Sequence, residues 1–184
     1  MLESNRKELL HALYTSEVPV IDILSTIDEE TFTYVREAVM YLQAVGCPPL
    51  QVTISSSGGS VGAGLAIYDI LRLYSGKTTA LVLGQACSMA AVILQGCKER
   101  LCAKYAQILV HEVRAETVAF SLLASSSKAN QRLVDGLKSS QDCVYSILAE
   151  RTGKTLTQVS RLCKKDKYLT AEEALKFGLI DRIV

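Results

Sequence analysis

One serine and one histidine, each in apolar surroundings, could together support acyl transfer. Ser88 separates two apolar stretches, at a position typical of the N-cap of a helix. A lone serine there is more often a structural cap, but as a nucleophile it would gain from the free N–H groups of the helix start. His111 is the candidate base, although a single histidine in an apolar run such as 108–113 is more often a core residue. The second histidine, His11, lies in a polar segment that reads as a surface helix.

A glycine pair provides a second candidate feature. Gly58 and Gly59 come shortly after the apolar run 50–54 and before the helical pattern 61–74. A phosphate-binding loop would need the lysine of a Walker motif or the full spacing of a dinucleotide fingerprint, and neither is present. Glycines also allow close approach of the backbone, which includes offering an N–H group to an oxyanion.

The carboxylate that would orient the histidine is not identified by these residues alone. Glu112 is adjacent to His111, so in a strand it would point to the opposite face. Asp166 lies in the charged run 164–167, which is most simply a solvated turn. Residue types and spacing therefore leave the acid unassigned.

Alternating strands and helices must position these residues. Short apolar runs predict strands at 19–24, 50–54, 78–83, 100–104 and 107–113, and helical periodicity is found at 29–45, 61–74 and 89–94. This alternation favours an α/β fold with a mostly parallel sheet. The segments 55–59 and 84–88 would then leave neighbouring strands at the carboxyl edge of the sheet. We expect a site between them, because ligands bind at that edge.

The C-terminal part reads as mostly helical. Residues 117–151 favour a helix that the serines at 125–127 could interrupt. Thr155 and Thr170 each begin a capping-box pattern that opens a further helix, and Gly178 ends the second of these. A chain of 184 residues suits one domain, which we expect to span 1–184.

Composition excludes several classes of function. The net charge is +1, which argues against nucleic-acid binding. The six cysteines form no C-x-x-C pair and no zinc-ligand spacing, so reduced, mostly buried thiols and a cytoplasmic location are expected. The N-terminus has no signal-peptide core, and the most apolar stretch, 80–94, is too short and too interrupted for a membrane span.

Several ordered segments of the chain resemble the Clp protease proteolytic subunit (ClpP) family, from about Pro19 to the C-terminus. Residues 56–69, S-S-G-G-S-V-G-A-G-L-A-I-Y-D, are similar to the family segment S-P-G-G-S-V-x-A-G-x-A-I-Y-D. Residues 84–91, G-Q-A-C-S-M-A-A, resemble its nucleophile segment G-Q-A-A-S-M-G-A. Val110-His111-Glu112 falls where the family has its histidine, and residues 166–174 and 178–181 resemble its C-terminal segments.

This resemblance implies roles for particular residues. Ser88 matches the nucleophile, His111 the general base and Asp166 the orienting acid. Gly59 and Met89 match the residues whose backbone N–H groups form the oxyanion hole. The implied fold is the ClpP/crotonase type, in which residues 117–151 would supply a protruding helical handle.

The resemblance also implies partners and an assembly. Family members form homo-oligomers of two stacked seven-membered rings, a tetradecamer, that enclose the active sites. An AAA+ unfoldase, which alone uses ATP, feeds them unfolded polypeptide, and the serine chemistry needs no cofactor or metal. The chain differs from the family pattern at Ser57 and Val113, which replace prolines, and after His111, where the glycine-rich stretch is missing.

Three alternatives to an active serine endopeptidase remain at this point. The first is a non-catalytic structural subunit of a mixed ring, favoured by the altered segment 111–113. The second is a crotonase-like acyl-CoA enzyme, although that group usually lacks a Ser-His-Asp set. The third is a peptidase with a Ser-Lys pair, which is usually anchored in a membrane.

Overall fold

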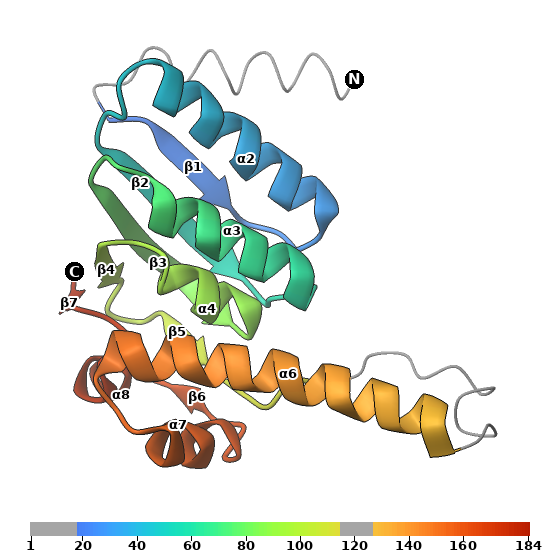
Figure 1. Cartoon of the computed structure of the whole chain (residues 1–184). Coiled ribbons are helices and arrows are strands. Elements are labelled where there is room, and N and C mark those ends of the chain that lie inside the picture. Colours follow the sequence, from blue (N-terminus) through green and yellow to red (C-terminus); the bar gives the residue numbers. More distant parts are fainter. Residues whose placement is uncertain (1–17, 115–126) are drawn as a thin grey trace.

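A largely parallel sheet with helices on one face forms the body of the molecule (Figure 1). The computed structural model describes residues 18–114 and 127–184. In chain order the elements are β1 (Val20–Ile23), α2 (Glu29–Ala44), β2 (Leu50–Ser56), α3 (Val61–Leu73), β3 (Thr78–Cys87), α4 (Met89–Leu94), β4 (Glu99–Cys102), β5 (Gln107–Leu109), α6 (Ser127–Thr152), α7 (Leu156–Cys163), β6 (Tyr168–Leu169), α8 (Ala171–Phe177) and β7 (Arg182–Ile183).

The strand order confirms the predicted α/β fold. Strands β1, β2, β3, β4 and β7 lie side by side in that order and are all parallel. Strand β5 pairs parallel with the far end of β3, and β6 pairs antiparallel with β5. The core consists of the buried residues of β1 to β4 together with the facing sides of α2, α3 and α4.

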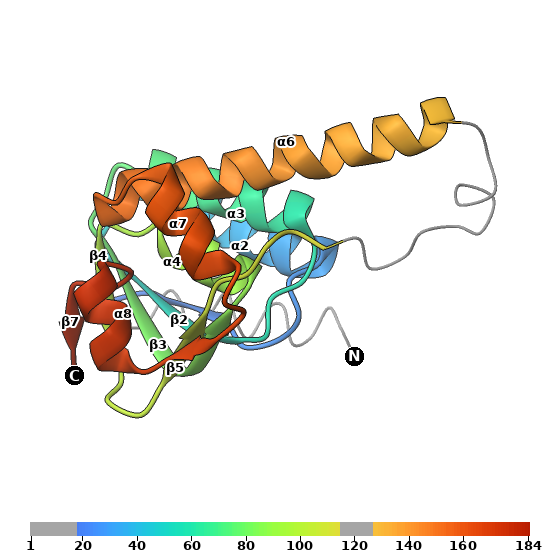
Figure 2. The ribbon, with the colours of Figure 1, turned by 90° about the horizontal axis from the view of Figure 1, so that it is seen from below.

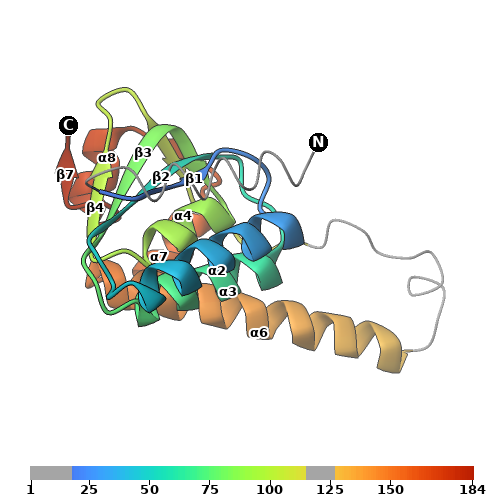
Figure 3. The same cartoon turned by 90° about the horizontal axis from the view of Figure 1, so that it is seen from above.

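Two views show how the helices are layered. Figure 2 and Figure 3 place α2, α3 and α4 on the same face of the sheet. The long helix α6 lies outside this layer, and its N-terminal half extends beyond the body. The predicted handle, 117–151, therefore includes a protruding helix, whereas residues 115–126 lie outside the described part of the chain, as does the predicted N-terminal helix with His11.

Strand β3 is longer than predicted, and this corrects the expected loop at 84–88. We predicted that the strand would end at Leu83, but it continues to Cys87. The backbone bends at Gly84, which has φ +69°. Before the bend residues 79–82 pair with β4, and after it residues 85–87 pair with β5. Residues 85–87 therefore form a strand and not a loop, because β5, which comes later in the chain, pairs with them. Strand β2 is also longer and reaches Ser56 instead of Ile54.

Local capping signals are found as predicted. Asp28 accepts a hydrogen bond from the N–H of Thr31 at the start of α2. Thr155 and Thr170 both form complete capping boxes, and Gly178 ends α8 in the left-handed conformation. These interactions involve residues three or four positions apart, which is why the sequence predicted them.

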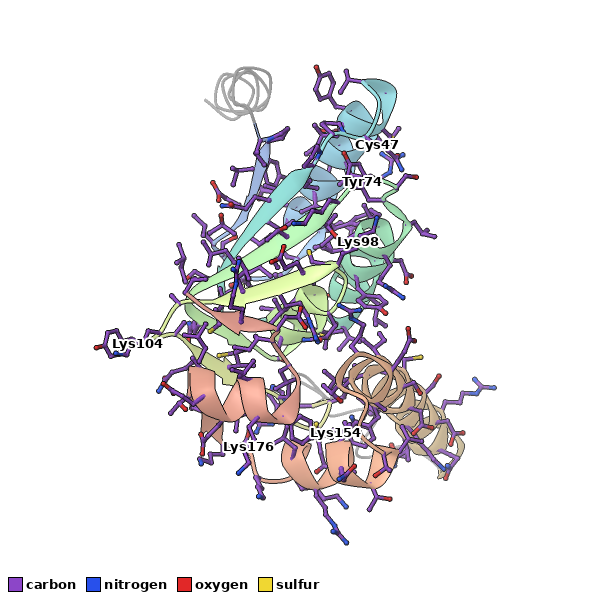
Figure 4. All side chains as sticks on the ribbon, turned by 90° about the vertical axis from the view of Figure 1, so that its left-hand side faces the viewer. Cys47, Tyr74, Lys98, Lys104, Lys154 and Lys176 are labelled. Atoms are coloured by element: carbon purple, nitrogen blue, oxygen red, sulfur yellow. The ribbon has the colours of Figure 1, made fainter. Side chains whose placement is uncertain are left out.

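The amino ends of the central strands are closed by a buried tyrosine. Tyr74 follows α3, and its hydroxyl donates a hydrogen bond to the carbonyl of Pro48 at 2.7 Å. Burial, with a smaller contribution from nearby Cys47, raises the pKa of Tyr74 to about 12. Figure 4 shows both residues at the same end of the sheet as Lys98, whose ammonium donates to the carbonyls of Ser75 and Gly76. This end is therefore a structural closure.

The cysteines are unpaired thiols, as predicted. Cys87, Cys97, Cys102 and Cys163 are buried, and Cys143 is exposed on α6. Burial raises the pKa of Cys97 to about 12, so this thiol stays protonated at neutral pH. In the part of the chain that the structure describes, no cluster of three or more His, Cys, Asp or Glu side chains is placed to hold a metal ion. Nor does any described helix, the long α6 included, offer an apolar stretch that could cross a bilayer.

Candidate active site

Ser88 occupies the single-residue turn between β3 and α4. Its backbone has φ 54° and ψ −123°, a conformation that side chains other than glycine rarely adopt. Its N–H donates to the carbonyl of Leu109 at 2.8 Å, which fixes the turn against β5. The side chain makes no capping hydrogen bond to the helix. The interpretation of Ser88 as an ordinary N-cap is therefore wrong, and the strained turn indicates a functional position.

The glycine pair lies against this turn. A Cβ atom on Gly58 would lie 2.6 Å from Ser88 Cβ and 2.7 Å from the Cys87 carbonyl oxygen. A Cβ atom on Gly59 would lie 2.2 Å from the carbonyl oxygen of Ile27. At both positions the added Cβ atom would clash with backbone atoms, which cannot move aside, so only glycine fits. This confirms the predicted proximity of the two segments at the carboxyl edge.

Two backbone N–H groups are available beside Ser88. A parallel bridge joins Ile27 to Gly59 through the N–H of Ile27 and the N–H of Ser60, so the N–H of Gly59 is not used. Met89 is the first residue of α4, where the N–H has no partner within the helix. Neither the Gly59 nor the Met89 amide donates a hydrogen bond to any described residue. Unused donors in the cavity that a serine lines are what an oxyanion hole requires.

A cavity of about 410 Å³ brings four of the predicted residues together. Its lining includes Gly59, Ser88, Met89 and His111. Its apolar wall is formed by side chains of α3, α4, α6 and the segment after β5, namely Val61, Val92, Val110 and Val144. The cavity could therefore hold an apolar group of a ligand beside Ser88.

His111 lies beyond the end of its strand. The predicted strand 107–113 ends at Leu109, and His111 lies in an irregular segment. Its Nδ1 atom is 2.6 Å from the carbonyl oxygen of Glu112. Nδ1 is therefore the protonated nitrogen, which donates to this carbonyl and leaves Nε2 as the basic atom.

Asp166 is held apart from this histidine. It follows α7 in a left-handed backbone conformation, with φ 49°. Its carboxylate accepts a hydrogen bond from the guanidinium of Arg114, and the two side chains are 49% and 60% exposed. Asp166 is not among the described residues that line the cavity. The structure therefore brings Ser88, His111, Gly59 and Met89 together and places Asp166 against a different partner.

Two residues beside the site were missed by sequence reasoning. Arg114 lines the cavity and binds Asp166. Gln141 of α6 accepts a hydrogen bond from the N–H of Val113 at 2.6 Å. The only signal for Arg114 was a basic residue three positions after His111, which is too common to be informative. Gln141 gave no signal, since its contact depends on the packing of α6.

Comparisons with known proteins identify the family. The model of the family described as Clp protease matches residues 4–184. The chain belongs to the Clp protease family. An ATP-dependent Clp protease proteolytic subunit of Chlorella vulgaris is 31% identical over 179 residues, which cover 96% of this chain and 85% of that protein.

A solved structure is similar in fold. A point mutant of ClpP1 from Listeria monocytogenes superposes with a TM-score of 0.81 at 19% identity, covering 98% of this chain and 95% of that one. The predicted ClpP-type fold is thereby confirmed. Family membership also confirms the expectation of a serine-type peptidase and argues against the crotonase-like and Ser-Lys alternatives.

Proposed function

We propose that this chain is the proteolytic subunit of a self-compartmentalising serine endopeptidase that hydrolyses peptide bonds of unfolded polypeptides. Ser88 is the nucleophile, His111 the general base and Asp166 the acid that orients the base. The observation that carries the proposal is the strained turn at Ser88, which faces the same cavity as His111 and the unused amides of Gly59 and Met89.

The proposed mechanism is acyl transfer through a tetrahedral intermediate. Nε2 of His111 takes the proton of Ser88 as the hydroxyl oxygen attacks the peptide carbonyl. The N–H groups of Gly59 and Met89 stabilise the oxyanion, and losing one donor of this kind typically costs about 2.7–4 kcal/mol in barrier. The imidazolium then protonates the leaving amine, and water hydrolyses the acyl-enzyme.

This chemistry is supplied by the chain's own residues, with no cofactor. The nucleophile, base and oxyanion donors all come from amino acids. In the proposed triad, Asp166 accepts a hydrogen bond from Nδ1 of His111. In the structure, both groups are bonded to other partners. Catalysis through the triad therefore requires a rearrangement of segment 111–114 relative to Asp166.

The assembly and partners belong to the same proposal. We propose a homo-oligomer of seven-membered rings, stacked as a tetradecamer, that receives substrate from an AAA+ unfoldase in the cytoplasm. The Chlorella relative is named as a subunit of an ATP-dependent protease, which supports an ATP-driven partner. The protruding helix α6 offers a surface for contact between rings. Exposed apolar side chains such as Leu73, Tyr105 and Val134 are candidates for burial between subunits.

Labelling with a fluorophosphonate probe tests the nucleophile. The probe phosphonylates an activated serine with loss of fluoride, so intact mass reports one adduct per active site. We expect an adduct on the wild type and none on Ser88→Ala. Ser57→Ala is the matched control, because Ser57 lines the same cavity and should leave labelling unchanged. Circular dichroism should show all three proteins to be folded.

The outcome decides between two kinds of subunit. An adduct on the wild type that is lost in Ser88→Ala, together with loss of peptide hydrolysis, supports the endopeptidase. The pairing of Asp166 with Arg114 is the observation that favours the alternative, a structural subunit of a mixed ring. Absence of labelling in every sized oligomer fraction would support that alternative.

A further inference from the structure

The two groups that would form the His111–Asp166 hydrogen bond of the proposed triad are each bonded to a residue of the short segment 111–114 instead. His111 Nδ1 is bonded to the carbonyl of Glu112, and Asp166 is bonded to Arg114. Three of these four residues lie within segment 111–114, and Asp166 is 52 positions away from Arg114. One change in this segment would therefore release the base and the acid together.

The two sets of contacts compete for the same groups. The protonated Nδ1 offers a single N–H, which cannot serve the Glu112 carbonyl and the Asp166 carboxylate at once. The carboxylate has further acceptor positions, but its charge-assisted bond is made to Arg114 and not to the imidazole. Arg114 therefore determines whether Asp166 is available to His111.

Helix α6 holds the segment in this arrangement. The N–H of Val113 donates to Gln141 Oε1 at 2.6 Å, and the Tyr145 hydroxyl lies 3.5 Å from Glu112 Oε1. The amide nitrogen Nε2 of Gln141 is buried without a hydrogen-bond partner in the described structure.

We propose that Arg114 is an inhibitory latch that keeps the catalytic acid of this peptidase away from its base. The inference rests on the proposed function, and it assigns Arg114 a regulatory role in that site. When Arg114 releases Asp166, the carboxylate turns to Nδ1 of His111 and the triad is completed. The position of α6, through Gln141, biases the latch toward its closed state.

A reversible latch requires a weak ion pair, and the Arg114–Asp166 pair is weak because both side chains are exposed to solvent. The side chains of Arg114 and Asp166 are 60% and 49% exposed. Exposed ion pairs shift equilibria by about 2- to 5-fold, because water and salt screen them. Removing Arg114 should therefore raise the open population, and with it the reactivity of Ser88, by about 2- to 5-fold.

The test measures the rate at which the fluorophosphonate probe labels Ser88 in the assembled full chain. Arg114→Gln removes the charge and keeps a side chain of similar length, and Arg114→Lys restores a cation. Lys167→Gln is the matched control, because it removes a similarly exposed ion pair, with Glu173, at the residue next to Asp166 in the sequence. We expect Arg114→Gln to be labelled about 2- to 5-fold faster than the wild type. Arg114→Lys should be close to the wild type, and Lys167→Gln unchanged.

A second background separates the latch from a general charge effect. If Arg114 acts through Asp166, Arg114→Gln should have no effect on labelling when combined with Asp166→Asn. An equal acceleration in that background, or in Lys167→Gln, would overturn the latch in favour of a general electrostatic effect.

The proposed function and the latch fail in different ways. Wild-type labelling with an unchanged or slower Arg114→Gln overturns the latch alone, since Ser88 would still be an activated nucleophile. Labelling of Arg114→Gln without labelling of the wild type supports the latch most strongly. No labelling of any variant overturns both proposals.

Discussion

Two arginine–aspartate pairs in this molecule have the same chemistry and opposite surroundings. Arg100 of β4 is buried, and its guanidinium bonds both oxygens of Asp181 as well as Gln95 Oε1 and the carbonyl of Gly178. The side chain of Arg114 is 60% exposed, and it contacts the Asp166 carboxylate through one hydrogen bond. The first pair joins α4, β4 and the C-terminal segment, whereas the second lies at the edge of the active-site cavity.

The difference shows how burial decides what an ion pair can do. A buried charge that loses its partner is left without solvation, so the Arg100–Asp181 pair cannot open without disrupting the fold. An exposed pair exchanges its partner for water at little cost, so the Arg114–Asp166 pair can open while the fold stays intact. The first pair is suited to structural support and the second to regulation.

The largest expected effect is on activity and comes from the exposed pair. Asp166→Asn should lower kcat by about 10²- to 10⁴-fold, because an amide cannot stabilise the imidazolium that forms during acyl transfer. The free energy of unfolding should change by less than about 0.5 kcal/mol, since the pair is exposed. Peptide hydrolysis and urea unfolding measure the two quantities.

The control for this variant is Asp135→Asn. Asp135 is an exposed residue of α6 that accepts a hydrogen bond from Gln131 and does not line the active-site cavity. Its substitution should leave kcat unchanged. A kcat for Asp166→Asn equal to that of the control would mean that Asp166 takes no part in catalysis.

The buried pair should show the reverse behaviour. Asp181→Asn should lower the free energy of unfolding by about 2 kcal/mol, because it leaves Arg100 buried without its counter-charge. This is less than for a fully buried pair, since the Asp181 side chain is 40% exposed. Removal of the exposed Arg72–Glu150 pair by Arg72→Gln should cost less than about 0.5 kcal/mol. Similar losses in both variants, measured by urea unfolding, would contradict the role of burial.

The smallest effect is the pH dependence of the stability difference between the wild type and Asp181→Asn. Burial by itself would raise the pKa of Asp181, but the hydrogen bonds and charge of Arg100 outweigh it, and the pKa is lowered. A lowered pKa contributes stability that is present above the unfolded-state pKa, about 3.9, and is lost as the pH falls through the folded-state value. The stability difference between wild type and Asp181→Asn should therefore be constant from about pH 5 to 7 and shrink below about pH 4. A difference that persists unchanged to pH 3 would show that the charge of Asp181 is not its source.

The sequence predicted the helix starts and the neighbourhood of Ser88 well for a definite reason. Helix starts at Asp28, Thr155 and Thr170 depend on residues within four positions, and these all formed as expected. The strand–helix alternation determined the α/β fold. The two segments near Ser88 and Gly59 came together because parallel neighbours share a carboxyl edge.

The sequence predicted the ends of strands and the surroundings of the acid poorly. Whether residues 85–87 form strand depends on β5 arriving beside them. The short strands β6 and β7 gave no signal, because two residues are too few for periodicity.

By itself, the sequence of this protein determined most of the helices and strands, the family and the residue types available for acyl transfer, because these follow from local patterns and ordered motifs. Only the tertiary structure decided that Asp166 is bonded to Arg114. It also decided that Gln141 of α6 accepts a hydrogen bond from Val113 and so holds the segment 111–114. The physical reason is distance along the chain. Side chains that compete for one carboxylate are brought together by the packing of separate elements, and that packing sets which partner is within reach.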